Sequence, residues 1–154
     1  TTALALTYAL YLLAAHPGEQ ERLAAELGQA LAGRDAAFTD LEHLKRTETV
    51  LLEAMRLYPP AWSVGREALV DVEIGGYRLP KGSTFFISQW VMHRDPDLFA
   101  DPERFLPERW DGDAQRRLPR FANSPFGGGP PICLGHRFAR LYTPLILPCQ
   151  ARRG

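Results

Sequence analysis

The sequence predicts a mainly α-helical fold with a small β-sheet, an α+β class, and three observations support this prediction. Residues 3–15 form an almost uniformly apolar run, which is typical of a buried helix. Leucines and alanines recur at helical spacing over residues 17–31. From residue 64 to residue 87 the apolar period changes to two, the spacing of a β-strand. With 154 residues, 45% of them hydrophobic and 23% charged, the chain is globular and makes one domain at most.

The opening helix should end near His16, because Pro17 cannot continue it but suits the first turn of the next helix. The apolar run is shorter than the ~20 residues that span a membrane. No basic flank precedes it, so it makes a poor signal peptide. A helix that is apolar on every side is normally buried in a protein larger than itself, so we expect the chain to be a piece of a longer one.

Two further helices follow. The second helix of the chain is amphipathic, and Gly33 is its expected stop. Thr39 and Asp40 are candidate caps for a third helix, which has a short first turn and a main part over residues 46–57. The segment Tyr58-Pro59-Pro60 then ends that helix, because a residue before proline disfavours helical geometry.

The strand region contains a predicted hairpin. Val70, Val72 and Ile74 alternate with acidic residues, and Gly75-Gly76 allows a tight turn into residues 77–79. A further strand is expected over residues 84–88. Such a small sheet cannot make a core alone, so we expect it to lean on the helices. The stretch from Asp95 to Asn123 is irregular, and a long ordered loop of this kind usually has a function.

Charge and cysteine content exclude several classes of protein. The chain has 18 basic and 18 acidic residues, so it lacks the basic surface of a nucleic-acid-binding protein. Its two cysteines, Cys133 and Cys149, are not spaced as a zinc site or a redox pair, and they are too few for a disulfide framework.

The most informative segment surrounds Cys133. Phe126 opens a loop with three consecutive glycines, and Cys133 follows where the chain turns helical, just before Gly135. Glycines let a backbone approach a flat ligand closely, and the N–H groups at a helix N-terminus stabilise a thiolate. A thiolate in this place suits the axial position of a haem iron. The alternative is a buried structural cysteine beside a glycine-rich turn.

A second candidate cluster is ionic. Glu53 and Arg56 lie three residues apart on one face of an otherwise apolar helix. A charged pair in such a helix is costly unless it is paired and hydrogen-bonded, so a buried network is favoured over a surface contact.

These motifs together resemble the cytochrome P-450 family of haem-thiolate monooxygenases. The haem-binding signature of that family reads Phe-x-x-Gly-x-Arg/His-x-Cys-x-Gly. Phe126, Gly129, Cys133 and Gly135 match it, whereas Pro131 stands where Arg or His is expected. The segment from Glu53 to Pro60 also resembles the Glu-x-x-Arg helix of the family. The resemblance runs from Thr1 to about Leu141, with its elements in family order, and it implies the C-terminal part of the cytochrome P-450 fold.

The resemblance implies roles for individual residues. Cys133 would be the axial thiolate ligand of the iron in haem, iron protoporphyrin IX, with Phe126, Gly129 and Gly135 shaping its loop. Thr1 would hydrogen-bond oxygen and help to deliver protons.

Two arginine assignments also follow from the resemblance. Arg66 would contact a haem propionate, although an ordinary strand-edge arginine is an equal alternative. Arg109 would join Glu53 and Arg56 in a structural network behind the haem, and Arg104, in a near-identical Pro-Glu-Arg-aromatic segment, is a substitute for it.

The implied activity is that of a monooxygenase, which inserts one oxygen atom of O2 into a small organic substrate. It would take two electrons from a ferredoxin or flavin reductase, either separate from the chain or fused to it. We expect no nucleic-acid partner and no membrane anchor in this chain, and we expect a cytoplasmic location.

Three departures from the family pattern favour alternatives to an active monooxygenase. Pro131 removes a propionate partner, Pro144 and Pro148 should break the last helix, and residues from about 142 to 154 form a divergent tail. We therefore expect the chain alone to bind haem poorly or not at all. One alternative is an inactive truncated or frame-shifted remnant, and another is a small α+β interaction module without a cofactor.

Overall fold

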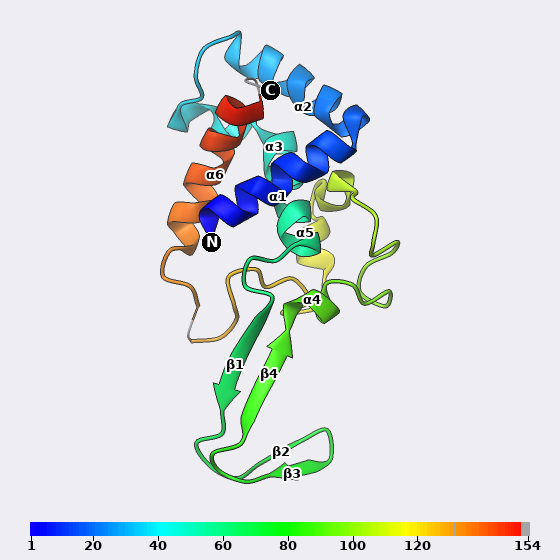
Figure 1. The fold of residues 1–154 in the computed structure, drawn as a ribbon, viewed down its shortest axis with the longest axis vertical. Helices are drawn as coiled ribbons and strands as arrows, with labels where there is room; N and C mark the ends of the chain where they lie inside the picture. Colours follow the sequence, from blue (N-terminus) through cyan, green and yellow to red (C-terminus); the bar gives the residue numbers. More distant parts are fainter. Residues whose placement is uncertain (131, 152–154) are drawn as a thin grey trace.

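The computed structural model describes residues 1–130 and 132–151. Its elements, in chain order, are α1 (Thr2–Ala15), α2 (Pro17–Leu31), the 3-10 helix η1 (Phe38–His43), α3 (Lys45–Leu57), β1 (Ser63–Glu67), β2 (Val72–Ile74), β3 (Tyr77–Leu79), β4 (Thr84–Ser88), α4 (Gln89–Met92), the 3-10 helix η2 (Pro107–Trp110), α5 (Ala114–Arg117) and α6 (His136–Ala151). The long helices gather at one end of an elongated molecule, and the strands extend from the other end (Figure 1). The mainly helical α+β class predicted from the sequence is confirmed.

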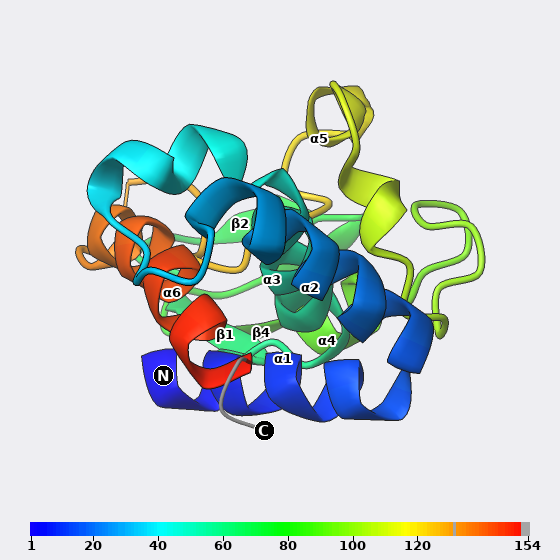
Figure 2. The same cartoon turned by 90° about the horizontal axis from the view of Figure 1, so that it is seen from above.

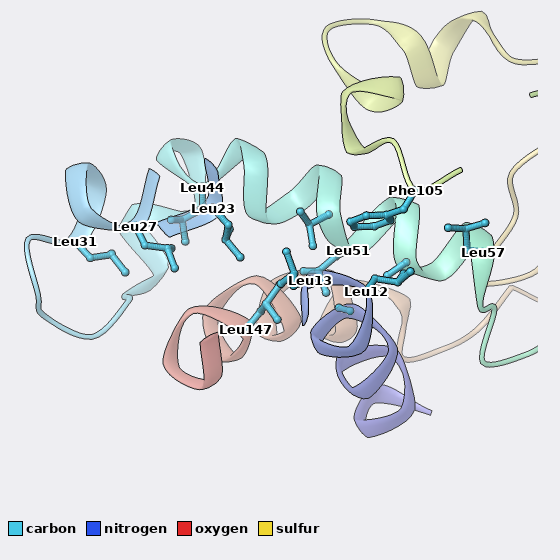
Figure 3. Packing of buried hydrophobic residues seen from close by; sticks show 13 residues of the cluster. Leu12, Leu13, Leu23, Leu27, Leu31, Leu44, Leu51, Leu57, Phe105 and Leu147 are labelled. Atoms are coloured by element: carbon cyan, nitrogen blue, oxygen red, sulfur yellow. The ribbon is translucent and has the colours of Figure 1, made fainter. Parts of the chain in front are cut away.

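Helix α3 is the centre of the helical end, because α1, α2, α6 and η2 all pack against it. Seen from above, α1 and α2 run past α3 on different sides (Figure 2). The core between them consists mainly of leucines, most of them from α1, α2, α3 and α6, with Phe105 at one edge (Figure 3). Helix α1 ends at Ala15 and is followed by His16, as the proline at position 17 predicts. Within the described residues, no helix is both long and apolar enough to cross a bilayer.

Helix α2 buries one leucine face and ends on a strained residue. Leu23, Leu27 and Leu31 are buried, as the helical spacing predicts. The left-handed residue that closes the helix is Ala32, with φ 46°, and Gly33 follows with φ 87°. The expected stop at Gly33 is therefore one residue late. A side chain in this left-handed region costs free energy that glycine would avoid.

The start of α3 is satisfied by a side chain from α2. The Glu26 carboxylate accepts hydrogen bonds from the backbone N–H groups of Arg46 and Thr47 at 2.5 and 2.9 Å and from the Thr47 hydroxyl at 2.8 Å. The predicted cap Asp40 instead lies in η1, where it accepts the N–H of Ala37 at 2.8 Å. A carboxylate at a helix N-terminus is favoured because it meets unpaired N–H groups and the positive end of the helix dipole.

The strands form two separate two-stranded antiparallel ladders, β1 with β4 and β2 with β3. Gly75-Gly76 makes the turn between β2 and β3, and both glycines have positive φ, as predicted. The expectation of a sheet that leans on the helices is wrong. Both ladders point away from the helical end (Figure 1), and Tyr77 and Phe86 are 75% and 77% exposed. Ladders this short have too little apolar area on one face to hold the sheet against the helices.

The last helix continues through its prolines, which contradicts the prediction that they break it. Helix α6 runs from His136 to Ala151 with Pro144 and Pro148 inside. Each proline lacks the N–H that would bond the carbonyl four residues earlier. Both prolines and Leu147 are nevertheless buried, and Leu147 belongs to the leucine core. Burial of this apolar face outweighs the two missing hydrogen bonds. Residues 152–154 of the expected tail lie outside the described residues.

Candidate functional site

One large cavity collects most of the residues singled out by the sequence. Its volume is about 580 Å³, and its lining includes Thr1, Arg66, Phe126, Cys133 and Gly135. These residues come from the start of α1, from β1 and from the loop before α6, which are far apart in the sequence. The volume lies within the range of sites that bury a small molecule or cofactor, roughly 300–1,000 Å³.

The walls of this cavity are largely apolar. Leu51, Leu52 and Met55 of α3 form one wall, and Phe138 and Leu141 of α6 form another. Against these walls stand a thiol, a guanidinium and a hydroxyl group. An apolar site with a few polar groups of this kind suits a flat hydrophobic ligand that carries charge at its edge.

Cys133 is held by backbone hydrogen bonds and its side chain is exposed. Its N–H donates to the carbonyl of Phe126 at 3.0 Å, and its own carbonyl accepts the N–H of His136 at 3.2 Å. The His136 ring nitrogen Nδ1 lies 2.9 Å from the same carbonyl. A turn at Leu134 and Gly135 separates Cys133 from α6, so the thiol lies just before the helix.

The three loop glycines have different reasons to be glycine. Gly127 and Gly129 have φ of 81° and 80°, which favours glycine. Gly128 has no positive φ, but a Cβ there would lie 2.6 Å from a ring carbon of Phe121. Gly129 does not line the cavity, so its role is confined to the backbone. Pro131, the departure from the family signature, lies outside the described residues.

Arg66 and Thr1 present polar groups to the cavity. The Nη1 group of Arg66 donates to the carbonyl of Gly65 at 2.8 Å, and no ion pair to Arg66 occurs within residues 1–130 and 132–151. Thr1 is the N-cap residue of α1, but among the described groups its hydroxyl makes no capping hydrogen bond. Both side chains are therefore available to a ligand.

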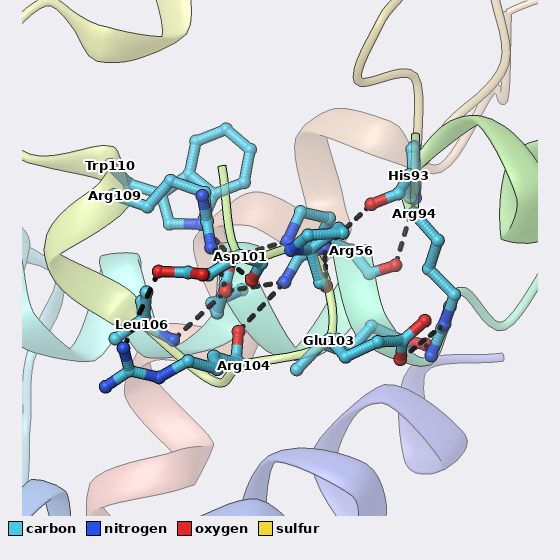
Figure 4. A network of polar contacts seen from close by, with 12 residues as sticks. Arg56, His93, Arg94, Asp101, Glu103, Arg104, Leu106, Arg109 and Trp110 are labelled. Atoms are coloured by element: carbon cyan, nitrogen blue, oxygen red, sulfur yellow. Dashed lines mark hydrogen bonds and ion pairs between the residues drawn. The ribbon is translucent and has the colours of Figure 1, made fainter. Parts of the chain in front are cut away.

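Glu53 and Arg56 form a fully buried pair that does not line the cavity, and Figure 4 shows Arg56 within its network of polar contacts. The Nε and Nη2 groups of Arg56 donate to the two carboxylate oxygens of Glu53, each at 2.8 Å. Arg56 also donates to the backbone carbonyls of His93, Pro102 and Arg104 at 2.6–3.1 Å. The pair thus ties α3 to the long irregular segment, as a charged pair in an apolar helix requires.

Arg109 supplies the third charged side chain of this network. Its Nε donates to Glu53 Oε1 at 3.3 Å, and its other nitrogens donate to the carbonyls of Ala100 and Asp101. The side chain of Arg104 is 69% exposed and lies 3.6 Å from Asp101, so only its backbone carbonyl takes part. Of the two near-identical segments, the structure brings the second to Glu53.

Sequence reasoning missed Trp110 in this network. Its indole Nε1 donates to Glu53 Oε2 at 2.8 Å, and the backbone N–H of Leu106 donates to Oε1 at 3.1 Å. The aromatic residue directly after Arg109 was the available signal. Sequence reasoning also missed three residues that line the cavity and belong to no recognisable pattern, namely Glu48, Gln115 and Arg140.

His93 packs against the other side of the network, where it contacts Arg56. It is 1% exposed, and its Nδ1 lies 3.1 Å from the carbonyl of Arg56. Burial lowers the pKa of His93 to about 4, and the positive charges of Arg56 and Arg94 act in the same direction.

The donor set at the cavity limits the kind of metal it can hold. Within the described part of the chain, no group of three or more histidine, cysteine, aspartate or glutamate side chains could hold a metal ion. A lone thiol such as Cys133 fits a metal that brings its other ligands with it, as iron in a porphyrin does.

Comparison with known protein families gives one match that covers almost the whole chain. The profile of the family described as Cytochrome P450 matches residues 1–150.

Individual relatives extend this match across organisms. A cyclooctat-9-en-7-ol 5-monooxygenase from Streptomyces melanosporofaciens is 42% identical over 153 residues, which is 99% of this chain and 33% of the relative. A cyclooctatin synthase from the same organism is 42% identical with the same coverage. Cytochrome P450 3A13 from Mus musculus is 40% identical over 96% of this chain and 29% of its own length. The chain thus spans about a third of the length of these curated relatives.

Proposed function

The chain belongs to the cytochrome P450 family, and from that premise we propose that it carries haem-holding and oxygen-activating residues of a monooxygenase. The reaction would insert one oxygen atom of O2 into a small organic substrate. Residues 1–154 would form part of a single P450 domain, from the end of the oxygen-activation helix through the Cys133 loop to the last helix, with a divergent stretch from about residue 142.

Cys133 is the residue that would hold the haem iron, through its thiolate. Iron in this family is bound by a cysteine thiolate, which pushes electron density towards oxygen and favours O–O cleavage. The apolar walls of α3 and α6 would cover the macrocycle and exclude water. Arg66 is the proposed partner of a cofactor carboxylate, since a guanidinium stays charged and binds a carboxylate through two hydrogen bonds.

Thr1 is the proposed proton carrier. Thr1 lines the same cavity as Cys133. Its hydroxyl makes no hydrogen bond that caps α1. A hydroxyl can accept one hydrogen bond while it donates another, so Thr1 can relay a proton towards O2 in the cavity. Glu53, Arg56 and Arg109 take no part in the reaction and hold the scaffold behind the site.

The proposed partners are a small organic substrate and an electron donor, a ferredoxin or a flavin reductase, which delivers two electrons per cycle. The substrate class follows from the family and from the monooxygenase name of one relative. The expected cytoplasmic location stays a prediction.

The observation that carries the proposal is the single cavity shared by Thr1, Arg66 and Cys133. To test it, this chain would replace the matching segment of the Streptomyces monooxygenase, to which it is 42% identical. We expect the chimera to take up haem with a thiolate-type absorption spectrum. Cys133→Ser should abolish that spectrum, and Cys149→Ser, which changes the other cysteine of the chain, should retain it.

A folded, haem-loaded chimera that keeps the thiolate spectrum after Cys133→Ser would refute the ligand assignment. For the isolated chain we expect weak haem binding at most, because the Cys133 side chain is exposed. A stoichiometric complex of the isolated chain with a thiolate-type spectrum would overturn that expectation.

A further inference from the structure

Phe121, twelve residues before Cys133, has an unfavourable backbone conformation. Its φ is 70°, in the left-handed region, and it shares a positive φ with two other described non-glycine residues, Ala32 and Asp101. A bulky side chain in this region is rare, and such strain persists only where the surrounding structure enforces it. The residue is nevertheless 45% exposed, so burial of a large apolar surface does not explain the strain.

The contact that accompanies this strain is with the glycine loop. A Cβ on Gly128 would lie 2.6 and 2.7 Å from two carbon atoms of the Phe121 ring. The ring therefore lies directly on the backbone at Gly128, at a distance that only glycine permits. The Arg120 guanidinium carbon lies 4.6 Å from the centroid of the same ring, which is within range of a cation–π interaction.

A series of hydrogen bonds links Phe121 to Cys133. The Ser124 hydroxyl donates to the Phe121 carbonyl at 3.1 Å, and the Gly127 N–H donates to the Ser124 carbonyl at 2.9 Å. The N–H of Cys133 in turn donates to the Phe126 carbonyl at 3.0 Å. These bonds all meet at the start of the glycine segment, where Gly127 is tied through Ser124 to Phe121 and the preceding Phe126 is tied to Cys133.

We propose that Phe121 is a positioning residue, whose ring holds the Gly127–Gly129 segment in place and thereby orients Cys133. The proposal rests on the proposed function of Cys133 as the haem ligand. If Phe121 has this role, the effects of substitutions at Gly128 and Phe121 should be coupled. Glycine is required at 128 because of the Phe121 ring and not because of the backbone conformation.

The test uses the whole chain with Cys149→Ser, in which Cys133 is the only thiol. Three variants are compared with this parent: Phe121→Ala, Gly128→Ala and the double variant. Two readouts need no haem, namely hydrogen exchange of the Cys133 amide and the rate at which iodoacetamide alkylates its thiol. We expect each single variant to raise the exchange rate roughly threefold or more, within the coupling range of residues in contact.

The double variant shows whether the effect of Gly128→Ala depends on the Phe121 ring. Adding Gly128→Ala to Phe121→Ala should cause no further change, since the ring that a Cβ would strike is gone. Equal effects of Gly128→Ala with and without the ring, or no effect in either background, would overturn the proposal. Phe121→Tyr, which keeps the ring, should preserve the parent rates, and Phe38→Ala, at an exposed phenylalanine in η1, serves as a control for general loosening.

Failure of this inference can be distinguished from failure of the haem assignment. In the chimera described above, Phe121→Ala should shift the thiolate absorption band, whereas Phe38→Ala should leave it in place. A coupled pair in the isolated chain together with a chimera that never shows a thiolate spectrum would refute the haem role alone. A thiolate spectrum that is unchanged by Phe121→Ala would refute the positioning role alone.

Discussion

The Glu53–Arg56 network and the Cys133 cavity lie on different sides of α3, and they differ in how completely this chain satisfies them. The carboxylate of Glu53 accepts hydrogen bonds from Arg56, Arg109, Trp110 and the backbone of Leu106, and it is fully buried. In the cavity, the thiol is exposed. The comparison shows that the charges of Glu53 and Arg56 are paired within the described residues, whereas the Cys133 thiol is left exposed.

The largest effect is expected from Glu53→Gln. This change leaves Arg56 buried without its counter-charge, which should lower the free energy of unfolding by about 3–5 kcal/mol. Urea denaturation measures it. The matched control is Glu48→Gln on the same helix, an exposed residue that lines the cavity, and it should change stability by under about 0.5 kcal/mol. Equal losses for both variants would remove the distinction between the two regions.

Acidification should weaken the network through the buried side chain of His93. The pKa of His93 is lowered to about 4 from 6.5, so below pH 6.5 the unfolded chain binds more protons than the folded one. Stability should therefore fall as the pH drops from 6.5 to about 4, by on the order of 2–3 kcal/mol. Urea denaturation at several pH values gives the slope, and His93→Gln should flatten it. His43→Gln, at an exposed histidine, should leave it unchanged; a slope that survives His93→Gln would assign it to other groups.

Backbone strain in the scaffold can be tested at the left-handed residue that closes α2. Ala32→Gly relieves a left-handed residue with φ 46° and should stabilise the chain by about 0.5–1 kcal/mol, after the added freedom of the unfolded chain is subtracted. Thermal unfolding measures the gain. Ala30→Gly, inside α2, should instead destabilise by about 0.5–1 kcal/mol. A loss at Ala32 would mean that its conformation carries no strain.

The smallest effect on stability is expected inside the cavity. Arg66→Gln removes a cation that has no ion pair among the described residues, so the free energy of unfolding should change by less than about 0.5 kcal/mol. Haem retention by the chimera should fall, because the proposed carboxylate partner is lost. A marked loss of stability in the isolated chain would show that Arg66 belongs to the scaffold.

The sequence was sufficient where a local pattern decides the structure. Pro17 set the end of α1, Gly75-Gly76 set the hairpin, and the Glu-x-x-Arg spacing placed two charges on one face of α3. It was insufficient where distant contacts decide. Pro144 and Pro148 remain helical because α6 packs into a core that no local signal describes. Trp110 entered the network because η2 brings it to Glu53, and Glu48 and Arg140 line the cavity only through the packing of α3 and α6.

The contact of Glu26 with the start of α3 has a consequence for the order of folding. The helix that carries Glu53 begins on a carboxylate from α2, about 20 residues earlier in the chain. Contacts of such short sequence separation form quickly, since little loop entropy is lost. The α2–α3 hairpin is therefore the expected nucleus of the helical end, and its amides should be the last to open during native-state exchange. The α3 wall of the cavity forms with this unit, whereas Thr1 and Cys133, which precede α1 and α6, should join it only when those helices pack against α3.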